Sequence, residues 1–531
     1  MRRLIFATII LLIATVLVTV VYFKNLNTTT QHISNVLRNI PNDASLIFEF
    51  NNEQSFYDIF TDNKLFTTIA GEEKMAELAE LRKLLLLNPL IASHLGGQNL
   101  FISLHPQKGS EIDFLLTTSV LKAFQPELLD QLSKQPKSGL VINTINLGGR
   151  QGYTIYLNQL KKRFYLIDKD DHTLSASFSK ELIEACAKYD YKKSKQAFVL
   201  MPDRQSSNSL ANLYVNYAAL SPFFEQLFIN KNTDIFKNFR QLPALAALSL
   251  NYKTDALMFN GTTQIENGQA DSYLGLFSNQ QPVINHLKAI FPATTAYSTN
   301  FAISNAQGFE SDLASWQTKS NFKVEKSSIL SKIKAETGID LKTEFTRLLG
   351  NEFAVITTRY REKIAIIQVK DGSKLKTLMI NISKMNTDNT GQFNYDKVPQ
   401  LLLGDAFTVF KRPYFKVMDN YLVLTNSTSE LASYDDSYAN RKFLSKMDGY
   451  SHFDELLAER SNVSFIIQFK NAQQLFKQDM KPAFYSAFEN MTPGWKNFYA
   501  ASWQFTSSEK NYYTNFCIQL SNDTTTVKNT F

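Results

Sequence analysis

The Ser-x-x-Lys patterns at Ser177–Lys180 and Ser331–Lys334 are the strongest candidates for chemistry in this chain. In acyl transferases of the penicillin-binding type, such a serine is the nucleophile, and a Lys-[Ser/Thr]-Gly strand later in the chain completes the pocket. Tyr214-Val215-Asn216 imitates the middle motif, but the closing pattern occurs only as Lys137-Ser138-Gly139, ahead of all the others. Because this order is scrambled, we interpret the short patterns as coincidence. A Gly-x-Ser-x-Gly nucleophile elbow is also absent from the sequence.

Metal-binding side chains are scattered along the chain. The closest histidines, His94 and His105, are eleven residues apart, and no pair has the i, i+4 spacing of a helical zinc site. Asp168–Asp171 resembles the start of a calcium loop, but Thr173 and Ser179 stand where the loop needs glycine and glutamate. We therefore predict an acidic turn and no metal site. The histidines are His32, His94, His105, His172, His286 and His452.

The richest glycine cluster is Leu147–Gly152, with the sequence LGGRQG. It lies between two apparent strands, whereas a glycine loop that binds a nucleotide opens a helix. We therefore predict a hairpin turn that needs positive φ, and no cofactor.

The chain has two cysteines, Cys186 and Cys517, each with apolar neighbours. Two widely spaced thiols in 531 residues are not a disulfide framework, and their spacing leaves open whether they pair. The simplest interpretation is that both are small buried hydrophobic side chains.

The net charge of +7 is spread thinly over the chain. Its basic clusters, Lys161–Arg163, Lys192–Lys193 and Arg359–Arg361, sit beside predicted turns and form no continuous stripe. The sequence therefore predicts no nucleic-acid partner.

An uncharged segment near the N-terminus, Leu4–Phe23, has the length of a membrane span. Twenty residues at about 1.5 Å each give roughly 30 Å, which is one bilayer core. Arg2 and Arg3 precede the span, and only Lys24 follows it closely. This bias predicts an N-terminus inside the cell and a body on the far side of the membrane.

A cleaved signal peptide is the alternative for this segment. Signal peptides have shorter apolar regions that end in small residues, whereas here Tyr22-Phe23-Lys24-Asn25 follows a long apolar run. We therefore predict an uncleaved anchor. A lipoprotein is excluded because the first cysteine is Cys186.

Behind the anchor, a polar tether over Asn25–Asn39 leads into a body rich in predicted strands. Apolar residues three or four positions apart predict a helix over Glu72–Leu87, and a second helix is predicted at Lys180–Lys188. Strands are predicted at Leu46–Phe50, Leu100–Leu104, Ile112–Thr117, Tyr153–Leu157, Phe164–Ile167 and Thr173–Ser177.

Five segments of the first half of the body recur in the second half in the same order. Their offsets lie between 249 and 253 residues, and such collinear matches indicate an internal duplication. The matched segments begin at Ile40 and Phe291, Leu95 and Leu348, Phe164 and Tyr414, Leu213 and Phe465, and Leu248 and Ala501.

We predict an α+β fold of two tandem duplicated units, each of mainly antiparallel sheet with helices packed on one side, preceded by one transmembrane helix. Hairpin-like connections favour antiparallel sheet, and the missing β-α-β alternation argues against a doubly wound fold. Related halves of this kind often pair about a pseudo-twofold axis. The predicted segments are a cytoplasmic stub and anchor (1–24), a tether (25–39), a first unit (40–285), a second unit (286–522) and a polar tail (523–531).

Three stretches resemble an uncharacterised family of membrane-anchored envelope proteins from Bacteroidetes-type bacteria. They are Ile40-Pro41-Asn42-Asp43-Ala44 before a strand, Ala501–Phe505, and Tyr512–Asn515 near the end. The family is a domain of unknown function, so the resemblance implies an anchored, extracytoplasmic protein and lends no catalytic residue or ligand.

The sequence favours a non-enzymatic, membrane-anchored cell-envelope protein whose periplasmic body binds a protein or another envelope component. It would cross the inner membrane once through Leu4–Phe23, and its expected partners are that membrane and an envelope protein or lipid. One alternative is a carrier or sensor of a hydrophobic envelope molecule, because aromatic-rich sheet backed by helices can enclose an apolar cavity. Another is an envelope hydrolase with an unrecognised active site. No catalytic, cofactor-binding or metal-binding residue is predicted.

Overall fold

The computed structural model of the chain describes residues 36–54, 56–57, 68, 72–95, 97–106, 112–121, 126–135, 139–169, 172–190, 209–229, 241–265, 272–319, 322–386, 388–490 and 495–521. The predicted anchor Leu4–Phe23 and the predicted tail 523–531 lie outside these residues. Within the ranges just given, no helix combines the length and the apolar character that a membrane crossing requires. Val36, Leu37 and Asn39 are buried, so the folded body includes the last residues of the predicted tether.

The chain forms two compact units. Unit 1 consists of Met1–Asp58 and Ala76–Tyr214, and unit 2 consists of Ile59–Met75 and Val215–Phe531. The predicted boundary between the halves, at residues 285 and 286, falls inside unit 2. The reason is that the strand of residues 256–265 pairs both with the strand of residues 244–252 and with the strand of residues 511–520.

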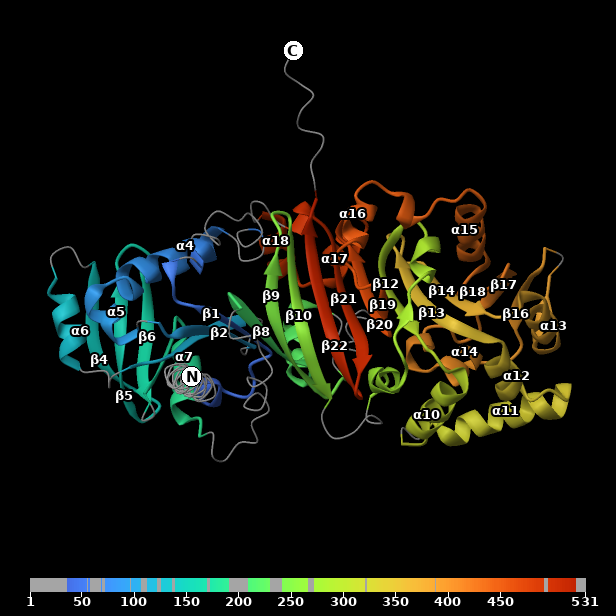
Figure 1. Cartoon of the computed structure of the whole chain (residues 1–531), viewed down its shortest axis with the longest axis horizontal. Helices are drawn as coiled ribbons and strands as arrows, with labels where there is room; N and C mark the ends of the chain where they lie inside the picture. The colour runs from blue at the N-terminus through green and yellow to red at the C-terminus, as the bar shows by residue number, and fades with distance from the viewer. Residues whose placement is uncertain are drawn as a thin grey trace, which may run out of the picture. The chain divides into compact units, whose positions relative to one another are not determined.

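The strands of unit 1 follow one another in the order β8-β1-β2-β3-β7-β6-β5-β4, and Figure 1 shows β4, β5 and β6 at one end of this series. From β1 to β4 every neighbouring pair is antiparallel. The strands are β1 (Leu46–Asn51), β2 (Asn99–Pro106), β3 (Ile112–Ser119), β4 (Leu140–Leu147), β5 (Arg150–Leu157), β6 (Lys162–Lys169), β7 (Thr173–Ser177) and β8 (Ala211–Asn216).

Helices cover both faces of the unit 1 sheet, which corrects the prediction of helices on one side. Successive residues of a strand point to opposite faces, and Leu115 and Leu116 of β3 pack into two different clusters. Leu115 packs against the helix of residues 180–188, and Leu116 packs against the helices of residues 72–95 and 126–133. The helices are α4 (Glu72–Leu81), the π-helix η1 (Arg82–Leu86), α5 (Pro89–Leu95), α6 (Pro126–Ser133) and α7 (Lys180–Lys188).

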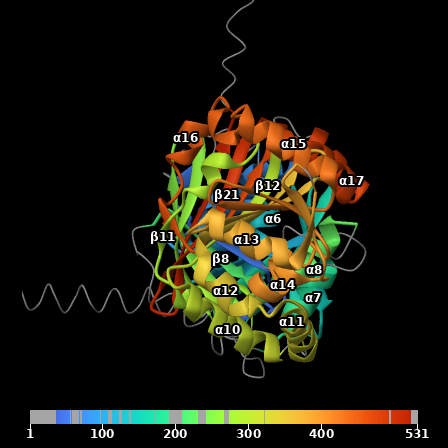
Figure 2. The same ribbon diagram turned by 90° about the vertical axis from the view of Figure 1, so that its right-hand side faces the viewer.

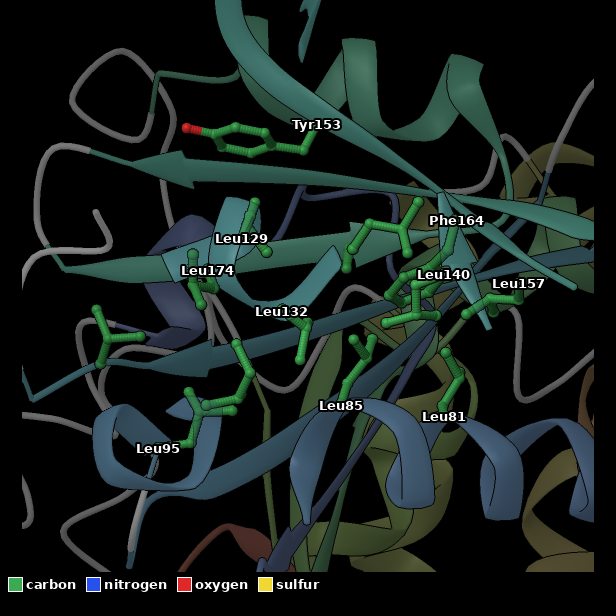
Figure 3. Close-up of a cluster of buried hydrophobic side chains, with 14 residues drawn as sticks. Leu81, Leu85, Leu95, Leu129, Leu132, Leu140, Tyr153, Leu157, Phe164 and Leu174 are labelled. Atoms are coloured by element: carbon green, nitrogen blue, oxygen red, sulfur yellow. The ribbon is translucent and has the colours of Figure 1, made fainter. Parts of the chain in front are cut away.

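The larger of the two clusters joins α4, η1, α5 and α6 to the sheet. In Figure 3, Leu81 and Leu85 point from the helices toward Leu140 and Phe164 of the strands. A buried side chain of this size contributes roughly 1.5–3 kcal/mol, so this cluster is a main source of the stability of unit 1.

The strands of unit 2 follow the order β9-β10-β22-β21-β20-β12-β13-β14-β18-β17-β16-β15, and all these pairings are antiparallel. A separate short pair joins β11 (Val283–Ile284) to β19 (Arg460–Ser461). The strands of the large sheet are β9 (Ala244–Tyr252), β10 (Ala256–Ile265), β12 (Thr295–Ala302), β13 (Leu349–Thr358), β14 (Lys363–Val369), β15 (Ser383–Met385), β16 (Thr390–Phe393), β17 (Tyr414–Met418), β18 (Tyr421–Thr425), β20 (Val463–Gln468), β21 (Phe498–Ser508) and β22 (Asn511–Leu520).

Helices also lie on both sides of the unit 2 strands, with α15 on one side and α10, α11 and α12 on the other (Figures 1 and 2). Phe353 of β13 stacks on Phe301 and meets Phe309 of α10, whereas the next residue, Ala354, packs in the cluster beneath α15. The helices are α8 (Leu220–Leu227), α10 (Ala306–Lys319), α11 (Lys323–Thr337), α12 (Leu341–Leu348), α13 (Gly372–Ile382), α14 (Val398–Leu403), α15 (Thr428–Ala439), α16 (Tyr450–Asp454), α17 (Phe469–Asp479) and α18 (Pro482–Asn490).

The order of neighbouring strands in unit 1 recurs in unit 2. The series β8-β1-β2-β3-β7-β6-β5-β4 corresponds, strand for strand, to β20-β12-β13-β14-β18-β17-β16-β15. The helix after β7 and the helix after β18 also begin alike, because Ser179 and Ser427 each accept a hydrogen bond from the backbone N–H three residues later. These matches assign a counterpart in unit 2 to most strand positions of unit 1.

A buried polar cluster as candidate functional site

Three polar side chains in unit 1 form a hydrogen-bonded chain of acid, imidazole and hydroxyl. Ser103 and His105 are two apart on β2 and therefore lie on the same face. The Oγ of Ser103 is 2.8 Å from Nε2 of His105, and Nδ1 of His105 is 2.9 Å from Oδ1 of Asp43, in the turn before β1. The same connectivity activates the nucleophile of serine hydrolases.

The serine end of this hydrogen-bonded series of side chains is closed to solvent. Ser103 and His105 have no exposed surface, whereas the side chain of Asp43 is 53% exposed. The hydroxyl of Ser103 also lies 3.4 Å from the carbonyl oxygen of Leu115, to which it can donate. A nucleophile without exposed surface cannot attack an external substrate in this conformation.

A second set of polar groups lies on the same face of the sheet, beneath α7. The amine of Lys169 and the thiol of Cys186 both donate to the carbonyl oxygen of Asn39, at 3.3 Å and 3.7 Å. Lys169 is 94% buried, and its amine lies 5.6 Å from the centre of the Tyr189 ring. Its amine makes no ion pair with any carboxylate that the structure describes.

Burial governs the electrostatics of these groups. It raises the pKa of the Cys186 thiol, against the opposing influence of Lys169 and Ser175, so this thiol is neutral and a poor nucleophile. At Asp43, burial also acts to raise the pKa, but the hydrogen bond and charge of His105 outweigh it and lower the pKa. Asp43 is therefore the negative charge of the cluster at neutral pH.

We call this set the polar cluster of unit 1. One further member, Thr117 of β3, has a buried hydroxyl without a hydrogen-bond partner among the described residues. The polar cluster consists of Asn39, Asp43, Ser103, His105, Thr117, Lys169, Ser175 and Cys186.

Unit 2 has aliphatic, aromatic or thioether side chains at five of the matching positions. Strand order and register identify equivalent positions in the two units. Ile356 is equivalent to Ser103, Ile366 to Thr117, Met418 to Lys169, Val423 to Ser175 and Tyr434 to Cys186. All five of these unit 2 residues belong to one hydrophobic cluster beneath α15. The fold therefore does not require polar groups at these five positions, although Thr358, at the position of His105, is polar, buried and donates to Glu362.

A buried carboxylate occurs in each unit, but on different strands. In unit 1, Glu49 of β1 accepts from Asn99 of β2 at 2.6 Å, and also from Asn212 and Tyr214 of β8. Burial, together with the charge and hydrogen bond of Glu49, raises the pKa of Tyr214 well above its usual value. The hydroxyl therefore stays protonated and donates to the carboxylate.

In unit 2 the acid and the amide exchange places. Glu352 of β13, the counterpart of Asn99, accepts from Asn300 of β12, the counterpart of Glu49, at 3.1 Å. Glu352 also accepts from the backbone N–H groups of His286 and Leu287, at 2.9 Å and 3.2 Å. Each carboxylate is 1% exposed, so both act inside the fold.

The Ser-x-x-Lys patterns do not form an active site. Ser177 is buried and donates to the carbonyl oxygen of Phe114 at 2.7 Å, while Lys180 turns to Glu184 on the surface. Ser331 and Lys334 are exposed on α11. Asn216 caps a short helix by accepting from the N–H of Ala219, and residues 137 and 138 lie outside the described residues.

The remaining predicted positions are structural. Gly148 and Gly149 have φ values of 64° and 94°, which confirms the predicted hairpin turn with positive φ. Cys186 and Cys517 are both free and buried. Of the acidic turn, Asp168 and Lys169 end β6, and residues 170 and 171 lie outside the described residues.

The histidines have local partners. His94 contacts the carbonyl of Leu90, and His452 contacts Asp255 at 2.9 Å, whereas His172 and His286 are exposed and His32 lies outside the described residues. The described residues hold no group of three or more side chains suited to a metal ion.

A partly open apolar cavity of about 230 Å³ lies in unit 2 between α17 and α18. Three aromatic side chains and one methionine make most of its lining apolar, and one acidic and one basic side chain stand among its lining residues. The lining residues are Phe469, Gln473, Phe476, Met480, Tyr485, Glu489 and Lys496.

Comparison with known proteins gives no relative. No family model, curated protein or solved structure matches the chain.

Proposed function

We propose that the chain is a non-enzymatic protein of the cell envelope, anchored in the inner membrane by Leu4–Phe23, whose periplasmic body binds a protein or another envelope component. One observation carries the non-enzymatic part of this proposal. The groups best suited to chemistry, Ser103, His105 and Cys186, have no exposed surface and are bonded to one another or to the backbone. The anchor rests on the uncharged twenty-residue segment and the arginines before it.

We further propose that the body arose by duplication, with halves near residues 40–285 and 286–522. The recurring strand order supports this, and so does the pairing of β10 with β22, the last strands of the two halves. The two strands run antiparallel with Asn260 opposite Asn515, as a twofold axis between two similar halves would place them.

Purification of the full-length protein after crosslinking in living cells tests the proposal. We expect an intact chain that begins at Met1, remains in the membrane fraction and carries a reproducible partner protein identified by mass spectrometry. A mature chain that begins near Asn25 would contradict the anchor. A chain recovered in repeated experiments without lipid and without any crosslinked protein, a second copy of itself included, would contradict the binding function.

The alternative of a carrier for a hydrophobic envelope molecule is favoured by the cavity between α17 and α18. Its apolar floor fits a short hydrocarbon or aromatic group, and Glu489 and Lys496 can hold a polar head of either charge. Lipid extraction of the same purified sample separates this alternative from the main proposal. A stoichiometric lipid that is lost in Phe476→Trp, a change that fills the cavity, would establish the carrier.

The alternative of an envelope hydrolase is favoured only by the Asp43, His105 and Ser103 chain. We expect a fluorophosphonate probe, which labels activated serines, to leave the folded protein unlabelled because Ser103 is buried. Labelling that disappears in Ser103→Ala, but persists in the matched variant Ser177→Ala, would instead show an active serine.

A further inference from the structure

The sheet of unit 1 ends at β4, whose only strand neighbour is β5 among the described residues. Leu147 and Arg150 face each other across the two-residue turn Gly148-Gly149. Residues that flank such a turn exchange both backbone hydrogen bonds, and the pattern then alternates along the strand. The hydrogen bond from the N–H of Asn158 to the carbonyl of Gly139 fits this alternation. The odd-numbered residues of β4 therefore direct their backbone N–H and C=O groups toward β5.

The even-numbered residues Ile142, Thr144 and Asn146 therefore turn their backbone groups away from β5. No described residue donates to or accepts from these backbone groups. The strand is open to solvent, because Val141 is 49% exposed and Asn143, Thr144 and Asn146 are also exposed. At Ile142, Thr144 and Asn146, β4 thus presents outward backbone donors and acceptors that no described residue uses.

This edge strand lacks the sequence features that normally prevent edge strands from pairing with other chains. Proteins protect edges with charged residues, proline, bulges or very short strands. β4 has eight residues, LVINTINL, without a charge, a proline or a register shift. Its counterpart at the end of the unit 2 sheet, β15, has three residues and carries Lys384.

We propose that β4 is a homodimer interface, at which β4 of a second copy pairs antiparallel and continues the sheet. This inference names the partner of the binding function proposed above and rests on it. The chain already makes such a joint inside unit 2, where β10 and β22 pair edge to edge over eight residues. An uncharged strand brings no like charges together when it meets itself, and a contact that uses the same edge on both copies closes at two.

The test is the dimerisation of the full-length protein in detergent, measured by sedimentation, with two variants at one position. Thr144→Pro removes an outward N–H that the fold does not use, and proline is tolerated on edge strands for that reason. Thr144→Ala keeps the N–H. We expect a dimer for the wild type and for Thr144→Ala, and at least a tenfold weaker dimer for Thr144→Pro with an unchanged circular dichroism spectrum.

Cysteine crosslinking in native membranes gives an independent readout, because Cys186 and Cys517 are buried and free. In a symmetric antiparallel pair only the residue on the twofold axis faces its own copy, so in a scan of single cysteines at Asn143, Thr144 and Asn146 we expect a disulfide-linked dimer at the position nearest the axis and none at the positions farther from it. A cysteine at Lys384 of β15 should give no dimer. A wild-type monomer, or a dimer that survives Thr144→Pro without crosslinks through β4, would overturn the proposal. Crosslinks from these positions to a different protein would overturn the homodimer and leave the binding function standing.

Discussion

Replacing Glu352 with alanine should lower the free energy of unfolding of unit 2 by about 3–5 kcal/mol, because a buried charged acceptor with several donors is lost. Its carboxylate accepts from the Asn300 amide and from the N–H groups of His286 and Leu287. Leu287 and Asn300 are buried, so water cannot readily replace the lost acceptor. Hydrogen exchange followed by mass spectrometry on peptides of β12 and β13 measures the effect locally, which suits a chain of two units.

Unit 1 suggests a control variant, because its pair Glu49 and Asn99 carries the acid and the amide on the other strands. The double variant Asn300→Glu, Glu352→Asn copies the arrangement of Glu49 and Asn99, with the acid on the first strand and the amide on the second. We expect it to recover at least half of the stability lost in Glu352→Ala. A single variant that loses less than about 1 kcal/mol, the scale of one ordinary hydrogen bond, would refute the role assigned to this carboxylate.

Replacing Lys169 with methionine should raise the free energy of unfolding of unit 1 by about 1–2 kcal/mol, because a buried ionic group is often less stabilising than a hydrophobic group of similar volume. Methionine is the residue of unit 2 at the corresponding position, Met418. The carbonyl of Asn39 keeps a donor after the change, since the Cys186 thiol also bonds to it. Chemical denaturation, with exchange in peptides of β6 and β7, measures the gain.

The reciprocal variant, Met418→Lys, places an amine in the hydrophobic cluster beneath α15. We expect it to destabilise unit 2 by about 3 kcal/mol or more, since a buried charge without a partner is costly. A loss of stability in Lys169→Met would show that the amine holds unit 1 together. The predicted gain would mean that Lys169 is kept for another purpose than stability.

Local patterns in the sequence were enough to locate many elements. The predicted helix Lys180–Lys188 and strand Thr173–Ser177 match α7 and β7, and the predicted helix Glu72–Leu87 corresponds to α4 and η1. Ser179 shows why such predictions succeed, because its side chain accepts from the N–H of Leu182 and fixes the helix start. The fold class, a mixture of helices and antiparallel sheet, follows from the same local signals.

The polar cluster escaped prediction for a physical reason. Along β2, Ser103 and His105 alternate with Ile102 and Leu104, and such alternation normally marks a strand with one face in water. Helices cover both faces of this sheet, so the apparently solvent-facing side chains are buried beneath α7. Nothing within β2 itself signals the second layer. Comparison with the hydrocarbon at the matching positions of unit 2, Ile356 among them, is the signal that would have found the cluster.

The pairing of β10 with β22 also determines how early the fold can be completed during synthesis. β10 ends at Ile265, and its partner β22 starts 246 residues later, at Asn511. At about 5–20 residues per second, a ribosome needs roughly 10–50 s to make the intervening chain. During that interval the far edge of β10 has no partner, and an unpaired edge is a template for pairing with other chains. The native pairing of β10, one of the longest strands, is therefore completed only after β22 has been made.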